Sequence, residues 1–152
     1  MPTYIKQLPA SYWLYKAWIV SILAMLGSLY FSEILKFAPC VLCWYQRIAI
    51  YPLVAILAVG ILKKDRGVHF YALPLAIFGL IVSIYQNLLY WNIIPENLAP
   101  CVAGVSCTTR YIEYFGFITI PLLALVALVI IIFSLFMFRY RTQMETSVDS
   151  KI

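Results

Sequence analysis

Four long apolar runs dominate the pattern of hydrophobic and polar positions along this 152-residue chain. Each run holds about 20 or more mostly apolar residues, which is the length that a helix needs to cross the hydrocarbon core of a bilayer. Few charged residues interrupt the runs. The pattern therefore predicts four membrane-spanning helices, at residues 15–34, 41–62, 69–91 and 114–138.

The connections between the runs differ in length. Only "KKDRG", residues 63–67, separates the second run from the third, so these two helices are predicted to form an antiparallel hairpin. A longer segment, residues 92–113, separates the third run from the fourth. It is neither low in complexity nor highly charged, and we expect an ordered loop. The polar tail, residues 139–152, is predicted to be disordered.

Composition supports membrane insertion over a soluble fold. The chain is 64% hydrophobic and only 11% charged, whereas soluble domains carry roughly 25% charged residues. We therefore predict an all-α membrane protein, with one membrane domain over residues 1–152 built as a four-transmembrane-helix bundle. The net charge of +5 could suit nucleic acid, but the basic residues flank apolar runs and form no long cluster. A role in topology is the better interpretation, and no nucleic-acid partner is expected.

The basic residues are distributed unevenly between the two ends of the predicted bundle. With four spans, both termini and the 63–67 turn share one side, which holds eight basic residues against three on the other. Because positively charged segments stay in the cytoplasm, both termini are predicted to be cytoplasmic. The eight are Lys6, Lys16, Lys63, Lys64, Arg66, Arg139, Arg141 and Lys151, and the three are Lys36, Arg47 and Arg110.

All four cysteines fall at or beyond the outer face on this topology. They form two close pairs, Cys40 with Cys43 and Cys101 with Cys107. Disulfides form and persist in the oxidising compartments outside the cytoplasm. Four cysteines allow three connectivities, of which pairing within each close pair needs the least bending of the chain. A redox-active pair, a soft-metal site and a purely structural role remain alternatives, although so short a loop makes a poor structural staple.

The first pair lies where a helix favours a thiolate. Pro39 suits the first position of the second helix, which would place Cys40 and Cys43 in the first turn, near unpaired N–H groups and the positive end of the helix dipole. Arg47 lies four residues beyond Cys43 and so shares its helix face, and Gln46 can add a donor. An arginine close to the hydrocarbon is costly, and its position on the outer side indicates a function.

The electrons of a dithiol need an acceptor. The sequence contains no glycine-rich dinucleotide loop and no haem-binding pair, so a lipid-dissolved quinone is the natural candidate, with Arg47 donating to its carbonyl as negative charge develops. Gln86 and Asn87, near the outer end of the third span, have two alternative roles. They could line the site of the quinone head group, or they could bond across helices, as amides in membranes often do.

The stretch "CVLCWYQR" at the outer start of the second span resembles the DsbB family of bacterial disulfide-generating membrane proteins, whose pattern is C-x-L-C-x-x-Q-R. Cys40, Leu42, Cys43, Gln46 and Arg47 match that pattern. The second pair, in the outer loop, also matches, although "CVAGVSC" leaves only five residues between its cysteines. That short interval is similar to the BdbC-like branch of the family.

The resemblance implies a thiol:quinone oxidoreductase in the bacterial inner (cytoplasmic) membrane that uses ubiquinone or menaquinone. Cys101 and Cys107 would form the disulfide that a DsbA-like soluble thioredoxin-fold oxidase attacks, at Cys101. Cys107 would then attack Cys40, and Cys43 would donate to a quinone held by Arg47, Gln46 and Gln86. The resemblance implies no metal.

Two other functions stay open on the sequence. A membrane protein that binds a metal through four thiolates would also need the two close pairs. A protein similar to vitamin K epoxide reductase would also have four helices and use a quinone, but that family carries its quinone-side C-x-x-C late in the bundle. The last span here has no cysteine.

Overall fold

The computed structural model describes residues 9–91, 93 and 119–149. This part of the chain is all-helical, as predicted, and a π-helical turn at Tyr30–Ile34 extends the first helix. Four of its helices are long and apolar enough to cross a membrane. They are α1 (Ala10–Leu29), α2 (Val41–Leu62), α3 (His69–Tyr90) and α4 (Ile120–Asp149).

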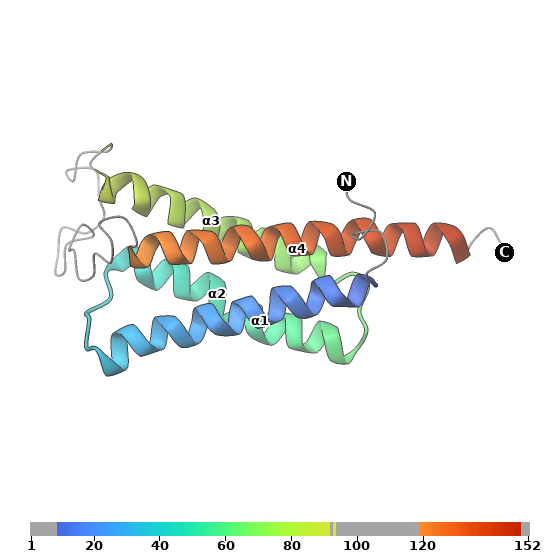
Figure 1. The fold of residues 1–152 in the computed structure, drawn as a ribbon, viewed down its shortest axis with the longest axis horizontal. Helices are drawn as coiled ribbons and strands as arrows, with labels where there is room; N and C mark the ends of the chain where they lie inside the picture. The colour runs from blue at the N-terminus through green and yellow to red at the C-terminus, as the bar shows by residue number, and fades with distance from the viewer. Residues whose placement is uncertain (1–8, 92, 94–118, 150–152) are drawn as a thin grey trace.

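The helices form a bundle in which each packs mainly against two neighbours. α4 lies between α1 and α3, and α2 closes the ring by packing against the other sides of α1 and α3. Figure 1 shows that consecutive helices run in opposite directions. It also shows that α1 and α4 lie close together near the start of α1 and diverge toward the end of the bundle where α2 begins.

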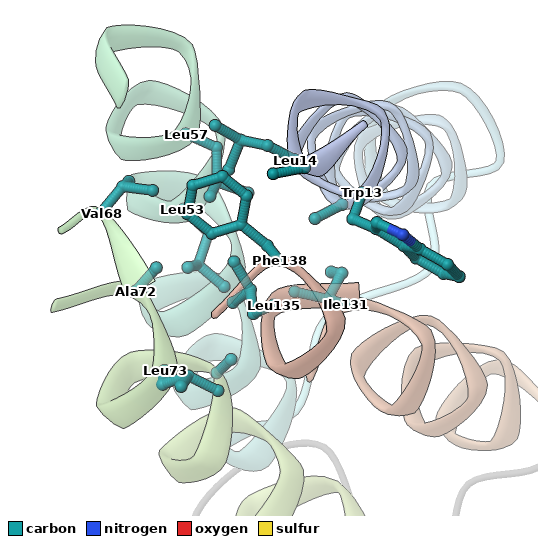
Figure 2. Packing of buried hydrophobic residues seen from close by; sticks show 13 residues of the cluster. Trp13, Leu14, Leu53, Leu57, Val68, Ala72, Leu73, Ile131, Leu135 and Phe138 are labelled. Atoms are coloured by element: carbon teal, nitrogen blue, oxygen red, sulfur yellow. The ribbon is translucent and has the colours of Figure 1, made fainter. Parts of the chain in front are cut away.

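The larger of the two buried apolar clusters in the described part of the chain lies toward the end of the bundle that carries the 63–67 turn. The start of α1, the second half of α2, the start of α3 and the middle of α4 all contribute buried side chains there (Figure 2). Trp13 packs edge-on against Phe133, with the ring centres 5.9 Å apart. Because lipid tails are as apolar as these side chains, close van der Waals packing holds such helices together. The opposite end of the bundle is more open.

Gly79 lets three helices approach closely. A methyl group at this position of α3 would lie 2.9 Å from Cβ of Ala49 in α2 and 3.2 Å from Cδ2 of Leu128 in α4. Both distances are shorter than ordinary van der Waals contacts. Small residues at helix crossings are typical of membrane bundles, and this crossing fixes how α3 faces its two neighbours.

The boundaries of the two central helices agree closely with the prediction. α2 spans the predicted residues, and α3 ends one residue earlier than expected. The turn between them is held by Asp65, whose carboxylate accepts from the backbone N–H of Gly67 at 2.7 Å and from the hydroxyl of Tyr71. These hydrogen bonds hold the pKa of the Asp65 carboxyl below its usual value. The hydrogen bond from Tyr71 is the larger cause.

The predicted start of the first helix was wrong. α1 begins at Ala10, five residues before the predicted position, because Pro9 supplies an extended residue directly before the helix. α4 begins at Ile120, and the predicted residues 114–118 lie outside the described part of the chain. Thr119 caps it by accepting from the N–H of Leu122 at 3.4 Å, and Pro121 occupies the first turn, where its missing N–H costs nothing.

The prediction of a disordered tail from residue 139 was wrong for residues 139–149, which continue α4. The extension packs against other parts of the chain. Glu145 accepts from the N–H of Ala10 at 3.4 Å, and Thr146 accepts from Arg66 at 3.4 Å. A helix already nucleated in the span extends at low cost, and these contacts place the start of α1, the turn and the end of α4 together.

Candidate active site

Cys40 and Cys43 lie at the start of α2. Pro39 was expected to be the first residue of this helix. The helix instead begins at Val41, so Pro39 lies before it. Cys40 takes the N-cap position instead, with extended backbone angles, and its sulfur accepts from the N–H of Cys43 at 3.4 Å. The cap therefore orients the first cysteine toward the second.

The two sulfurs are 2.8 Å apart, and both cysteines are free thiols in this structure. Cys40 is buried and Cys43 is partly exposed. The hydrogen bond with Cys43, together with burial, holds the pKa of the Cys40 thiol well above its usual value. The contact between the two sulfurs can be made with either thiol as the donor. The geometry suits a pair that alternates between dithiol and disulfide.

Two buried glutamines form a chain of hydrogen bonds that ends on the sulfurs. Gln46 Nε2 donates to Gln86 Oε1 at 2.8 Å. Gln86 Nε2 in turn donates to Cys43 Sγ at 3.4 Å and to Cys40 Sγ at 3.5 Å. Gln86 comes from α3, so this chain joins α3 to the start of α2. The sequence had suggested a quinone contact or a bond across helices for Gln86, and missed its contact with the cysteines.

Asn87 bonds across helices, which is one of the two roles that the sequence left open for it. Its Nδ2 donates to the carbonyl of Ser83 at 2.8 Å and to the carbonyl of Pro121 at 3.1 Å. The second bond joins α3 to the first turn of α4. Asn87 therefore holds helices together, and no contact with the sulfurs is seen for it.

Arg47 lies one turn beyond Cys43 and is anchored to α1. Its Nε donates to Ser28 Oγ at 3.0 Å and its Nη2 donates to the Ser28 carbonyl at 3.1 Å. The guanidinium also lies over the ring of Trp44, 5.3 Å from its centre. These contacts hold a positive charge beside the cysteines. Ser28 was missed in the sequence because a serine in an apolar span usually bonds only within its own helix.

A cavity of about 470 Å³ opens beside these groups, where α1 and α4 diverge. Cys40, Cys43, Gln46, Arg47 and Gln86 all line it, and most of its other lining is apolar. Much of the apolar lining comes from α1, the π-helical turn that follows it and α4, and it includes Leu23, Phe31, Leu123 and Ile130. The structure thus brings five of the seven predicted site residues to one cavity. The other two, Cys101 and Cys107, lie outside the described residues.

The sequence matches a family model over residues 10–138, described as "Disulfide bond formation protein DsbB". The chain belongs to the DsbB family. This confirms the resemblance inferred from "CVLCWYQR" and makes the protein a disulfide oxidoreductase, as expected. Membership of DsbB favours disulfide chemistry over the metal-binding and vitamin K epoxide reductase-like alternatives.

Relatives of the chain also carry names that refer to disulfide formation. The chain is 54% identical over 121 residues to disulfide bond formation protein C of Bacillus subtilis (strain 168), covering 78% of this chain and 86% of that one. It is 47% identical over 128 residues to probable disulfide formation protein C 2 of Bacillus anthracis, covering 84% and 90%. A probable disulfide formation protein of Metapseudomonas resinovorans is 40% identical over 126 residues, covering 82% and 88%. No solved structure matches the chain significantly.

Proposed function

We propose that this chain re-oxidises a soluble, DsbA-like thioredoxin-fold thiol oxidase and passes the electrons to a quinone of the membrane, ubiquinone or menaquinone. The observation that carries the proposal is the shared cavity. A close dithiol and an arginine face one apolar space between helices that lie within the span. A lipid-soluble acceptor can reach such a space, whereas a soluble protein cannot.

The residues that line the cavity fit a quinone. The apolar walls from α1 and α4 suit a ring and the start of an isoprenoid tail, and Arg47 is a donor for a carbonyl oxygen. Tyr51 also lines the cavity, and its buried hydroxyl has no hydrogen-bond partner among the described residues. An unpaired buried hydroxyl is costly, so a polar ligand atom would stabilise this wall. Gln46 and Gln86 complete the polar lining.

The electrons and protons of the proposed reaction balance. Oxidation of a dithiol to a disulfide releases two electrons and two protons, which equals what the reduction of a quinone to a quinol takes up. In this chain, Cys43 is the electron donor because it is the partly exposed sulfur on the cavity, and Cys40 is its disulfide partner. Arg47 stabilises negative charge that develops next to Cys43.

A second cysteine pair would connect this site to the soluble partner. We propose that a thiolate of the partner attacks the Cys101–Cys107 disulfide at Cys101, and that Cys107 then attacks Cys40 and releases Cys43. Each exchange forms one disulfide bond and breaks another, so no electrons are lost on the way. The need for a second pair follows from access. Cys40 and Cys43 line a cavity inside the bundle, which a folded partner would reach poorly.

The protein would lie in the bacterial inner membrane with both termini in the cytoplasm and both cysteine pairs on the outer side. The start of α1, the 63–67 turn and the end of α4 lie together at one end of the bundle, and the start of α2 lies at the other (Figure 1). Cys40 is the N-cap residue of α2. Among the described residues, most of the basic side chains belong to the segments at the first end. The positive-inside rule then supports this orientation.

The proposal is tested with the purified full-length chain, a reduced thioredoxin-fold oxidase and a short-chain quinone, whose absorbance reports reduction. We expect one quinone to be reduced for each disulfide formed in the partner, because both are two-electron couples. Cys43→Ser should abolish quinone reduction. Oxidation of the partner without quinone consumption would overturn the proposal.

A further inference from the structure

The hydrogen bonds of Gln86 are directed at sulfur. Both of its donor contacts in the described part of the chain go to cysteine sulfurs, at 3.4 and 3.5 Å. Its side chain is only 2% exposed. An amide N–H bonds weakly to a neutral disulfide sulfur but more strongly to a thiolate, because the bond is then charge-assisted. The contact therefore distinguishes the two redox states of the pair.

Gln46 determines which end of the Gln86 amide faces the sulfurs. An amide presents an NH2 group at one end and an oxygen at the other. Because Gln46 Nε2 donates to Gln86 Oε1 at 2.8 Å, the oxygen is engaged and the NH2 group faces the cysteines. Without that bond, Gln86 could rotate and place its oxygen against a thiolate, which would be repulsive.

We propose that Gln86 is a catalytic residue that stabilises the Cys43 thiolate, and that Gln46 is a positioning residue that keeps the Gln86 donor directed at the sulfurs. In this role, Gln86 acts on the protein's own cysteine pair. The inference rests on the proposed dithiol chemistry of Cys40 and Cys43, but it does not depend on a quinone. It gives Gln86 a role that holds in the absence of any cofactor.

The direction of the effect follows from which state is stabilised. The donor lowers the free energy of the reduced, thiolate-bearing pair relative to the disulfide. Removing it should therefore make the thiolate scarcer at neutral pH and shift the thiol–disulfide equilibrium toward the disulfide. One charge-assisted hydrogen bond corresponds to roughly a tenfold change in each quantity.

The test follows Cys43 in the full-length, reduced chain by alkylation with a small neutral reagent, with the Cys43 peptide quantified by mass spectrometry across a range of pH. Gln86→Met keeps the side-chain length and removes the donor. We expect its alkylation rate at pH 7 to fall about tenfold, and its pH profile to move toward alkaline values. Gln46→Met should change both in the same direction by a smaller factor, since it leaves Gln86 in place.

Asn87→Ala is the matched control, because it removes a buried amide from the next position of the same helix that bonds to carbonyls instead. It should leave the pH profile unchanged even if the bundle is less stable. Equilibration with glutathione buffers gives a second readout, in which Gln86→Met should favour the Cys40–Cys43 disulfide about tenfold more than the unsubstituted chain does.

The outcomes separate this inference from the proposed function. If Cys43 reacts as fast in Gln86→Met as in the unsubstituted chain, the role of Gln86 is wrong while the dithiol chemistry stands. If Gln86→Met slows alkylation and Gln46→Met does not, the positioning role of Gln46 is wrong. If Cys40 and Cys43 of the unsubstituted chain form no disulfide in any glutathione buffer, both the inference and the proposed function fail.

Discussion

Arg47 of α2 is fixed to Ser28 of α1 by two hydrogen bonds, one to the hydroxyl at 3.0 Å and one to the carbonyl at 3.1 Å. The guanidinium is thereby held at the cavity wall, one helical turn beyond Cys43. Ser28 lies two residues before the π-helical turn at Tyr30–Ile34, and such turns often occur at functional sites. The position of the positive charge beside the cysteines thus depends on a second helix.

Arg47→Ala should reduce kcat/KM for quinone on the order of 100-fold, the usual effect of removing a donor from a developing negative charge. Thiol exchange with the soluble partner should stay largely intact. Arg47→Lys should restore only part of the activity, because an ammonium cannot bond to both atoms of Ser28 and to a ligand through one planar group. Steady-state kinetics at varied quinone concentration measure this, and an unchanged dependence on quinone would rule out the role of Arg47.

Ser28→Ala should raise the KM for quinone by about threefold to tenfold, because Arg47 loses one of its two anchoring bonds. Ser28→Thr keeps the hydroxyl and should behave much like the unsubstituted protein. Ser21→Ala is the control: Ser21 is a buried serine of the same helix whose hydroxyl bonds to the carbonyl of Trp18. An equal effect of Ser28→Ala and Ser21→Ala would show that only helix stability had changed.

The orientation in the membrane can be tested with a membrane-impermeant thiol reagent on intact spheroplasts. After mild reduction, Cys101 and Cys107 should be labelled from outside. A cysteine introduced by Met144→Cys, at an exposed position in the extension of α4, should be labelled only after lysis. The reverse pattern would contradict the assignment of the termini to the cytoplasm, and with it the positive-inside interpretation.

The order of electron transfer predicts which cysteine captures the partner. In Cys107→Ser, the mixed disulfide between Cys101 and the soluble oxidase cannot be resolved and should accumulate. In Cys43→Ser, re-oxidation by quinone should stop whatever happens at the loop pair. Non-reducing gels of the single serine variants, expressed with the partner, show the trapped species. Capture of the partner by Cys40 or Cys43 would mean that the relay runs in another direction.

Much of the fold followed from apolar run length, because the spanning requirement leaves little freedom. α2 was predicted to the residue, since Cys40 and Lys63 mark both ends of its apolar run. The start of α1 was not, because Pro9 determines it through local backbone geometry rather than through hydropathy.

The candidate site was predictable where its residues are close in sequence. Cys43 and Arg47 share a helix face by spacing alone. The partners from other helices were not predictable in this way. Whether Gln86 bonds to the cysteines or to a neighbouring helix depends on the rotation of α3 against α2, which close packing at Gly79 determines. Ser28 likewise meets Arg47 only because of how α1 packs against α2.

We propose that electrons leave the Cys40–Cys43 pair through a membrane quinone. The most direct measurement is the redox state of each cysteine in cells whose quinone synthesis is blocked, by acid trapping, alkylation and mass spectrometry of the cysteine peptides. We predict that Cys40 and Cys43 accumulate as thiols, and that adding back a quinone restores their disulfide within minutes. If Cys40 and Cys43 stay oxidised without quinone while the soluble partner is still being re-oxidised, the account is contradicted.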